Sequence, residues 1–348
     1  MRCTRLEINE LKARIKDGNI SGWYILCGEE DYLKRYYAKE LREKIIPEGD
    51  PFAPFNYVSF DGADIDFAAV YEAVKSPPMM GEYKLIEWKY ASLDGLKEGQ
   101  KGALESLFPL KEEYPYSVFL ISVNADGFDT GTKKKPSKLK KTLSAAFDII
   151  EFSKSGDAQL LSWLKKHFDA EKISVDMSVL NAMLFRCGRS MELLNNEVIK
   201  LSSYLKANGR CAVRAEDVEL VCSATVECEA FALSNAVTEK NTEKAFAALA
   251  DLKMRRVEPG AVISMLEKTY SELTSVSLLL DEGKGVSDIE EILKLHAFKA
   301  KLYINAAKKS TTKKLADTLS QISRIDASSK SGGLSGYGVI EMFVTQNI

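Results

Sequence analysis

The first candidate site for chemistry is the segment Gly28–Lys34, GEEDYLK, which follows the apolar run Trp23–Cys27. A phosphate-binding loop, G-x-x-x-x-G-K-[ST], uses glycines for close backbone approach, its lysine for the phosphates and its hydroxyl for Mg²⁺. This segment has one glycine, no Lys-Ser/Thr pair and three carboxylates, which would repel a triphosphate. The only Gly-Lys pair in the chain, Gly283-Lys284, is followed by another glycine. We therefore expect no ATP site, no cofactor and no intrinsic enzymatic activity.

The cysteines and histidines form no metal-binding or catalytic motif. The two histidines, His167 and His296, lie far apart, and the six cysteines include no C-x-x-C pair. A zinc site needs closely spaced ligands on at least one side. We therefore expect reduced, mostly buried thiols, as in cytosolic proteins, with no metal site and no catalytic residues.

The adjacent residues Met79 and Met80 are candidates for a binding site, because they follow Pro77-Pro78 and precede Gly81. Two neighbouring side chains just past a Pro-Pro cannot both face one core, so at least one should be exposed. Methionine adapts to an apolar pocket, and exposed adjacent apolar residues often mark an interface. The alternative is that both side chains pack under the turn before the next strand.

A run with six lysines in nine positions lies between the last two expected strands. Such a run can contact DNA phosphates, although no aromatic residue is interleaved to stack on bases. The alternative, common for charge runs, is a solvated connection without a ligand. The lysines are Lys133, Lys134, Lys135, Lys138, Lys140 and Lys141.

The first 150 residues alternate between short apolar runs and helical patterns such as Asp31–Ile45 and Phe67–Val74. Strands separated by helices imply crossover connections, a parallel sheet and helices on both faces. The chain should therefore begin with an α/β domain. The expected strands are Trp23–Cys27, Tyr57–Phe60, Lys84–Trp88, Ser117–Val123 and Phe147–Phe152.

From Asp157 onwards strand patterns disappear and helical patterns follow one another. Asp157 and Ser190 are suited to cap helices, and the long stretch Pro259–Glu282 is apolar on more than one side. A helix with that pattern packs against several neighbours. We divide the chain into an α/β domain at 1–152 and two all-α domains at 153–225 and 226–348.

The overall charge is close to neutral, with a formal net charge of −2 and a pI near 6.0. A contact with nucleic acid must therefore come from a local patch. No apolar run approaches the roughly 18 residues that a membrane span needs, so we expect a cytoplasmic protein without membrane contact.

Several motifs, in order and at similar spacing over nearly the full chain, resemble the delta subunit of bacterial DNA polymerase III. The opening YILCGEEDYL is similar to that family's “YLLxGEExYL”, although no single motif is specific. The motifs are Tyr24–Leu33, Ser76–Leu85, Leu194–Leu201, Glu229–Leu233 and the set Asp326, Lys330 and Glu341.

The resemblance implies a clamp-loader architecture with an AAA+-like α/β domain of five parallel strands, a helical lid and a helical collar. It implies a non-catalytic subunit that opens the beta sliding clamp for loading onto primer-template DNA. The partners implied are that clamp and the ATP-binding gamma/tau and delta-prime subunits, which would meet the collar at 226–348.

In the family, two adjacent large apolar residues plug into a pocket on the clamp, and Met79 and Met80 stand at the matching positions. Pro78 and Gly81 would complete the element. Leu-Phe or Phe-Phe is more usual there, so the methionines predict a softer anchor. Two alternatives stay open: a helical scaffold subunit that does not touch the clamp, and an active AAA+ ATPase.

Overall fold

The computed structural model describes residues 8–63, 65–132, 134–331 and 336–348. It divides into two compact units, Met1–Ser155 and Gly156–Ile348, which are treated separately below. The first unit combines a sheet with helices and the second is mostly helical, so the predicted fold class is confirmed.

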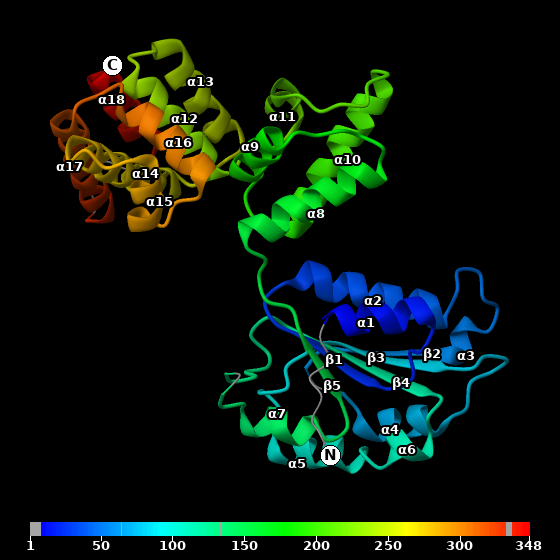
Figure 1. The fold of residues 1–348 in the computed structure, drawn as a ribbon. Helices are drawn as coiled ribbons and strands as arrows, with labels where there is room; N and C mark the ends of the chain where they lie inside the picture. The colour runs from blue at the N-terminus through cyan, green and yellow to red at the C-terminus, as the bar shows by residue number, and fades with distance from the viewer. Residues whose placement is uncertain (1–7, 64, 133, 332–335) are drawn as a thin grey trace. The chain divides into compact units, whose positions relative to one another are not determined.

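The first unit contains a five-stranded parallel sheet in the order β2-β3-β4-β1-β5 (Figure 1). All five residues of β1 are buried, as expected for a parallel strand that is covered on both faces. The five predicted strands are thus all present. They are β1 (Trp23–Cys27), β2 (Tyr57–Asp61), β3 (Lys84–Ala91), β4 (Ser117–Val123) and β5 (Asp148–Glu151).

Helices cover both faces of this sheet, with α1 and α2 on one face and α4 to α7 on the other (Figure 1). The two-residue period of β1 divides its side chains between two cores: Trp23 and Ile25 pack with α4 to α7, whereas Tyr24 and Leu26 pack with α1 and α2. The helices are α1 (Ile8–Asp17), α2 (Asp31–Ile45), α3 (Ala53–Asn56), α4 (Phe67–Lys75), α5 (Glu98–Ser106), α6 (Leu110–Glu113) and α7 (Lys138–Leu143).

Gly28 ends β1 in a conformation that favours glycine. Its φ is +101°, and a Cβ at this position would lie 2.4 Å from the carbonyl oxygen of Phe152. That close approach lets the chain after β5 run beside the start of α2, where the Glu30 N–H donates to the Phe152 carbonyl at 3.0 Å.

The lysine-rich connection differs from the loop that the sequence predicts. Its second half forms the short helix α7, which Ser137 caps by accepting a hydrogen bond from the Lys140 N–H at 3.1 Å. Its first half is a turn closed by an antiparallel bridge between Gly131 and Pro136. Ser137 before a segment of lysines and leucines is a typical start of a helix, but the run of charges favoured the prediction of a loop.

The described residues of the second unit form helices, apart from one isolated β-bridge between Ser174 and Ala212. Ser190 caps α10 as predicted, whereas Gly156 rather than Asp157 is the residue before α8. The helices are α8 (Asp157–Ala170), α9 (Met177–Cys187), α10 (Met191–Ala207), α11 (Ala215–Val221), α12 (Val226–Thr238), α13 (Thr242–Met254), α14 (Pro259–Asp281), α15 (Val286–Leu293), α16 (Ala297–Ala307), α17 (Thr312–Lys330) and α18 (Tyr337–Asn347).

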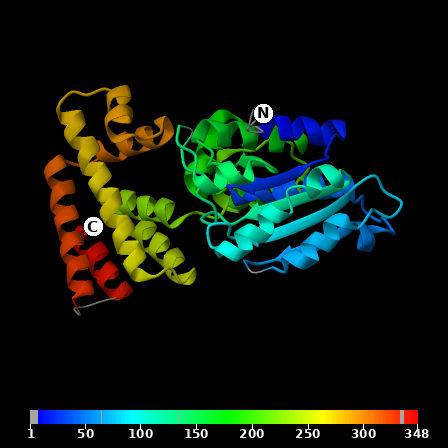
Figure 2. The same ribbon diagram turned by 90° about the horizontal axis from the view of Figure 1, so that it is seen from below.

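The long helix α14 is the centre of the largest core in this unit. It contacts α12, α16, α17 and α18, which confirms that it packs against several neighbours. Figure 2 shows α14 in yellow beside the orange-red α17. Val262, Leu266, Tyr270 and Leu273 on α14 are all buried in a core whose members run from residue 230 to residue 344. The predicted division of this unit at residue 225 stays a prediction.

Among the described residues, no single helix has the length and apolar composition to cross a membrane. One pair, α11 with α12, passes that test by length and composition when taken together, but it is bent by 111°.

We expect Gly28→Ala to lower the free energy of unfolding of the first unit by about 2–4 kcal/mol, because the new Cβ meets backbone atoms at a positive φ. Urea unfolding followed by tryptophan fluorescence measures this. Gly102→Ala is the matched control, since Gly102 lies in α5 with open space around it. This substitution should raise the free energy of unfolding by about 0.5–1 kcal/mol, because alanine favours a helix more than glycine does. Equal effects of the two substitutions would contradict the close approach at Gly28.

Candidate functional site

The segment between α4 and β3 presents Met79 and Met80 to solvent. Their exposed fractions are 43% and 85%, so neither packs under the turn before β3. Pro78 is half-buried and Gly81 is exposed. Because this loop precedes β3, it lies at the edge where the parallel strands begin, opposite the edge that holds Gly28.

The backbone of this loop is held by Asn56, the buried last residue of α3. Asn56 Nδ2 donates to the Met79 carbonyl at 2.9 Å, and Asn56 Oδ1 accepts from the Met79 N–H at 2.7 Å. This pair of bonds imitates the pairing of a β-ladder. No local pattern could predict this pair of bonds, because Asn56 and Met79 are 23 residues apart.

Residues close to Met79 form a partly apolar surface with it. A Cβ on Gly81 would lie 3.2 Å from Asn56 Nδ2, so glycine leaves the bonded amide undisturbed. Met80 has a φ of +55°, a left-handed conformation that is uncommon for this residue type and that directs its side chain outward. Phe55, next to Asn56, is 56% exposed. The arrangement can bind an apolar pocket on a partner.

The predicted DNA-contacting lysines fall into two groups, one before and one within α7. Lys134 and Lys135 are exposed in the turn, and Lys138 and Lys141 are exposed on α7. Lys140 differs, because its ammonium lies 3.7 Å from the Glu151 carboxylate. Lys133 lies outside the described residues. DNA contact by these lysines stays a prediction.

At the carboxyl ends of β1 and β4, Lys34 occupies the region where α/β folds commonly bind a ligand. Its ammonium donates to the carbonyl oxygens of Gly28 and Val123, each at 2.7 Å, and lies 2.8 Å from Asp31. Lys34 is 3% exposed, so this cation points into the protein. Burial also raises the pKa of the neighbouring Glu30 carboxyl.

A crevice of about 410 Å³ lies beside Lys34, between α2 and the ends of β3 and β4. Its charged groups bind one another: Arg42 donates to both oxygens of Glu87, at 3.1 and 2.9 Å. Glu87 is buried and also accepts a hydrogen bond from the Tyr57 hydroxyl at 2.6 Å. Burial, followed by that bond, raises the pKa of Tyr57. These contacts stabilise the crevice wall without an added ligand.

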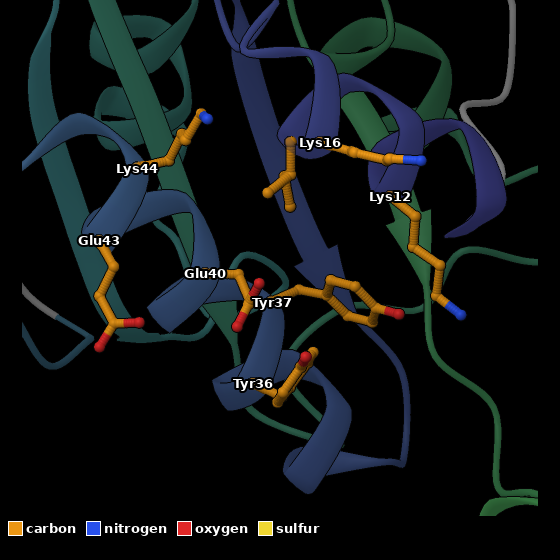
Figure 3. Close-up of a pocket in the computed structure, with 8 residues that line it drawn as sticks. Lys12, Lys16, Tyr36, Tyr37, Glu40, Glu43 and Lys44 are labelled. Atoms are coloured by element: carbon orange, nitrogen blue, oxygen red, sulfur yellow. The ribbon is translucent and has the colours of Figure 1, made fainter. Parts of the chain in front are cut away.

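A second hollow, of about 510 Å³, lies between α1 and α2 (Figure 3). Charges of both signs line it, from three lysines and two glutamates, together with Tyr36 and Tyr37. Burial raises the pKa of Tyr37 to about 12, and the Lys12 ammonium lies 5.8 Å from the centre of its ring. None of the predicted site residues lines this hollow. Its charged residues are Lys12, Lys16, Glu40, Glu43 and Lys44.

Comparisons with known proteins connect both units to one family. Residues 24–152 match the family described as “DNA polymerase III, delta subunit”. Residues 227–347 match the family described as “DNA polymerase III delta subunit, C-terminal domain”. Together these stretches make up most of the chain.

Two curated relatives are similar over nearly their whole length. The DNA polymerase III subunit delta of Bacillus subtilis is 21% identical over 338 residues, which cover 95% of this chain and 94% of the relative. The probable DNA polymerase III subunit delta of Aquifex aeolicus is 23% identical over 321 residues, which cover 88% and 85%.

Among solved structures, the DNA clamp loader delta protein of Bacillus subtilis has a similar fold. The TM-score is 0.56 at 20% sequence identity, over 97% of this chain and 98% of that one. At this identity the likeness describes the fold alone.

Replacing Lys34 by methionine should lower the free energy of unfolding by about 2–3 kcal/mol, because the carbonyls of Gly28 and Val123 lose a charged donor in a buried place. Urea unfolding measures the change. Lys39→Met on the same helix is the control, since the Lys39 side chain is 68% exposed and should change stability by less than about 0.5 kcal/mol. A Lys34→Met protein as stable as the control would show that the ammonium does not hold the strands.

Proposed function

Since this chain belongs to the family of DNA polymerase III delta subunits, we propose that it binds a ring-shaped sliding clamp through Met79 and Met80 and favours the open ring during DNA replication. The observation that carries the proposal is the pair of exposed methionines on a backbone fixed by Asn56. Met80, at 85%, is the most exposed large apolar side chain among the described residues of the first unit.

The fixed backbone favours the methionines as an anchor. A loop that is already ordered loses little conformational freedom when its tip enters a pocket, so more of the contact energy remains as affinity. Methionine side chains adjust their own shape to the pocket. A clamp contact of this kind acts on ring opening only if it is stronger for the open ring than for the closed one.

The chain acts, in this proposal, without hydrolysing ATP. The Lys34 ammonium binds the carbonyls of Gly28 and Val123 and the Asp31 carboxylate, so it is not directed toward a phosphate. Asp31 and its neighbours Glu29 and Glu30 add negative charge at the same edge. ATP would be bound by other loader subunits, of the gamma/tau type.

The second unit would join those subunits through residues 226–348. Large apolar side chains are exposed there despite a well-filled core, and exposed apolar residues of this size favour a protein partner. They include Met254, Leu278, Ile292 and Met342.

We expect the double substitution Met79→Ala/Met80→Ala to weaken binding to the sliding clamp of the same organism by about thirtyfold or more, as for a hot-spot anchor worth ~2 kcal/mol. Surface plasmon resonance with the clamp immobilised measures the affinity. Met177→Ala/Leu193→Ala is the matched control, because both residues are exposed, large and apolar and lie on helices of the second unit outside residues 226–348. A wild-type chain without clamp affinity would favour the scaffold alternative.

Asn56→Ala should weaken clamp binding by about tenfold, because the methionine loop loses both hydrogen bonds that order it. Asn56→Asp keeps the acceptor for the Met79 N–H and should fall between wild type and Asn56→Ala. The same binding experiment, with thermal unfolding of each variant recorded beside it, measures the effect. Unchanged affinity in Asn56→Ala would mean that clamp binding does not need a held loop.

A further inference from the structure

Among the described residues, one cluster brings together two thiols and a carboxylate. Cys187 ends α9, Glu197 lies on α10 and Cys222 follows α11, and their exposed fractions are 3%, 6% and 3%. One ligand atom from each, two sulfurs and a carboxylate oxygen, lies within 4.8 Å of the other two. The three residues are distant in sequence. The spacing of the cysteines, from which no metal site was expected, therefore could not reveal this cluster.

Backbone contacts fix the three residues relative to one another. Arg186 donates from Nε to the Cys222 carbonyl at 2.8 Å and from Nη2 to the Glu219 carbonyl at 3.0 Å, which joins the end of α9 to α11. The Ser223 N–H donates to Glu197 Oε2 at 3.3 Å, which joins the same segment to α10. The cluster is therefore preorganised by three separate elements.

The charges around the cluster balance in a way that suits a dication. The Lys200 ammonium lies 2.7 Å from Glu197, so this buried carboxylate is already compensated. A dication that displaces one proton from each thiol leaves the net charge of the site unchanged, because two protons are exchanged for two positive charges.

We propose that Cys187, Glu197 and Cys222 bind a zinc ion that fastens the ends of α9, α10 and α11 together. Two sulfur ligands select a soft or borderline metal over Mg²⁺ or Ca²⁺. Tetrahedral zinc with bonds of about 2.3 Å to sulfur and 2.0–2.2 Å to oxygen holds such ligand atoms roughly 3.6–3.8 Å apart, so a small contraction of the cluster suffices. Water would take the fourth position.

The test titrates zinc into the full chain, reduced and freed of metal, by calorimetry. We expect one zinc ion bound per chain, with the two thiol protons released on binding. Cobalt is a second probe, because thiolate coordination gives it a sulfur-to-metal charge-transfer absorption. Zinc at about 100 times its Kd should also raise the Tm of the helical unit by roughly 5 °C.

Matched variants identify the ligands. Cys187→Ser and Cys222→Ser should each abolish the cobalt absorption and the Tm shift, whereas Cys211→Ser, at an exposed cysteine outside the cluster, should keep both. Glu197→Gln keeps the side-chain shape, so it tests the site even where a cysteine variant fails to fold. It should weaken zinc binding by at least the roughly 10- to 100-fold that loss of a supporting partner costs in zinc proteins.

Two results would overturn the proposal. One is zinc binding that is absent, or equal in wild type and Glu197→Gln. The other is isolation of Cys187 and Cys222 as a disulfide from cells lysed with a thiol-blocking reagent, since oxidised sulfurs cannot supply the two thiolates.

Discussion

The buried ammonium of Lys34 is the interaction on which the arrangement of the first unit depends. It joins the residue after β1 to the end of β4 through the carbonyls of Gly28 and Val123, and it lies at the start of α2 beside Asp31. A cation inside a protein is tolerated only when its donors are satisfied, so α2, Gly28 and the end of β4 must take up compatible positions. The edge of the sheet that usually receives a ligand is therefore stabilised by the protein's own side chains.

The opposite edge of the sheet has the contrasting character. There the N–H and carbonyl of Met79 are hydrogen-bonded to Asn56, which orders the loop. The large apolar side chains of the same loop are exposed. One edge thus serves the stability of the unit and the other is suited to a partner. This division fits membership of the DNA polymerase III delta family, because a subunit needs a surface that contacts its partners.

Local patterns predicted the elements well, because a strand such as Ser117–Val123 or a helix such as Asp31–Ile45 is specified by its own residues. Short segments also showed that the phosphate-binding motif is absent and predicted that at least one of the paired methionines is exposed. The contacts that organise the sites could not be predicted from the sequence. Asn56 with Met79, Lys34 with Val123, and Cys187 with Cys222 are formed between segments that only the folded chain brings together, and no periodicity records them. The helix α7 was missed because its capping serine lies inside a run of lysines.

The bonds from Asn56 to the main chain of Met79 have a consequence for how this surface can change over generations. An amide that recognises only an N–H and a carbonyl is indifferent to the side chain carried between them. Residue 79 can therefore be exchanged without disturbing these two bonds, and residue 80, which points outward, can be any residue that accepts its left-handed φ of +55°. A lineage is free to match these two positions to the surface of its own partner, one substitution at a time, while the fold beneath stays the same.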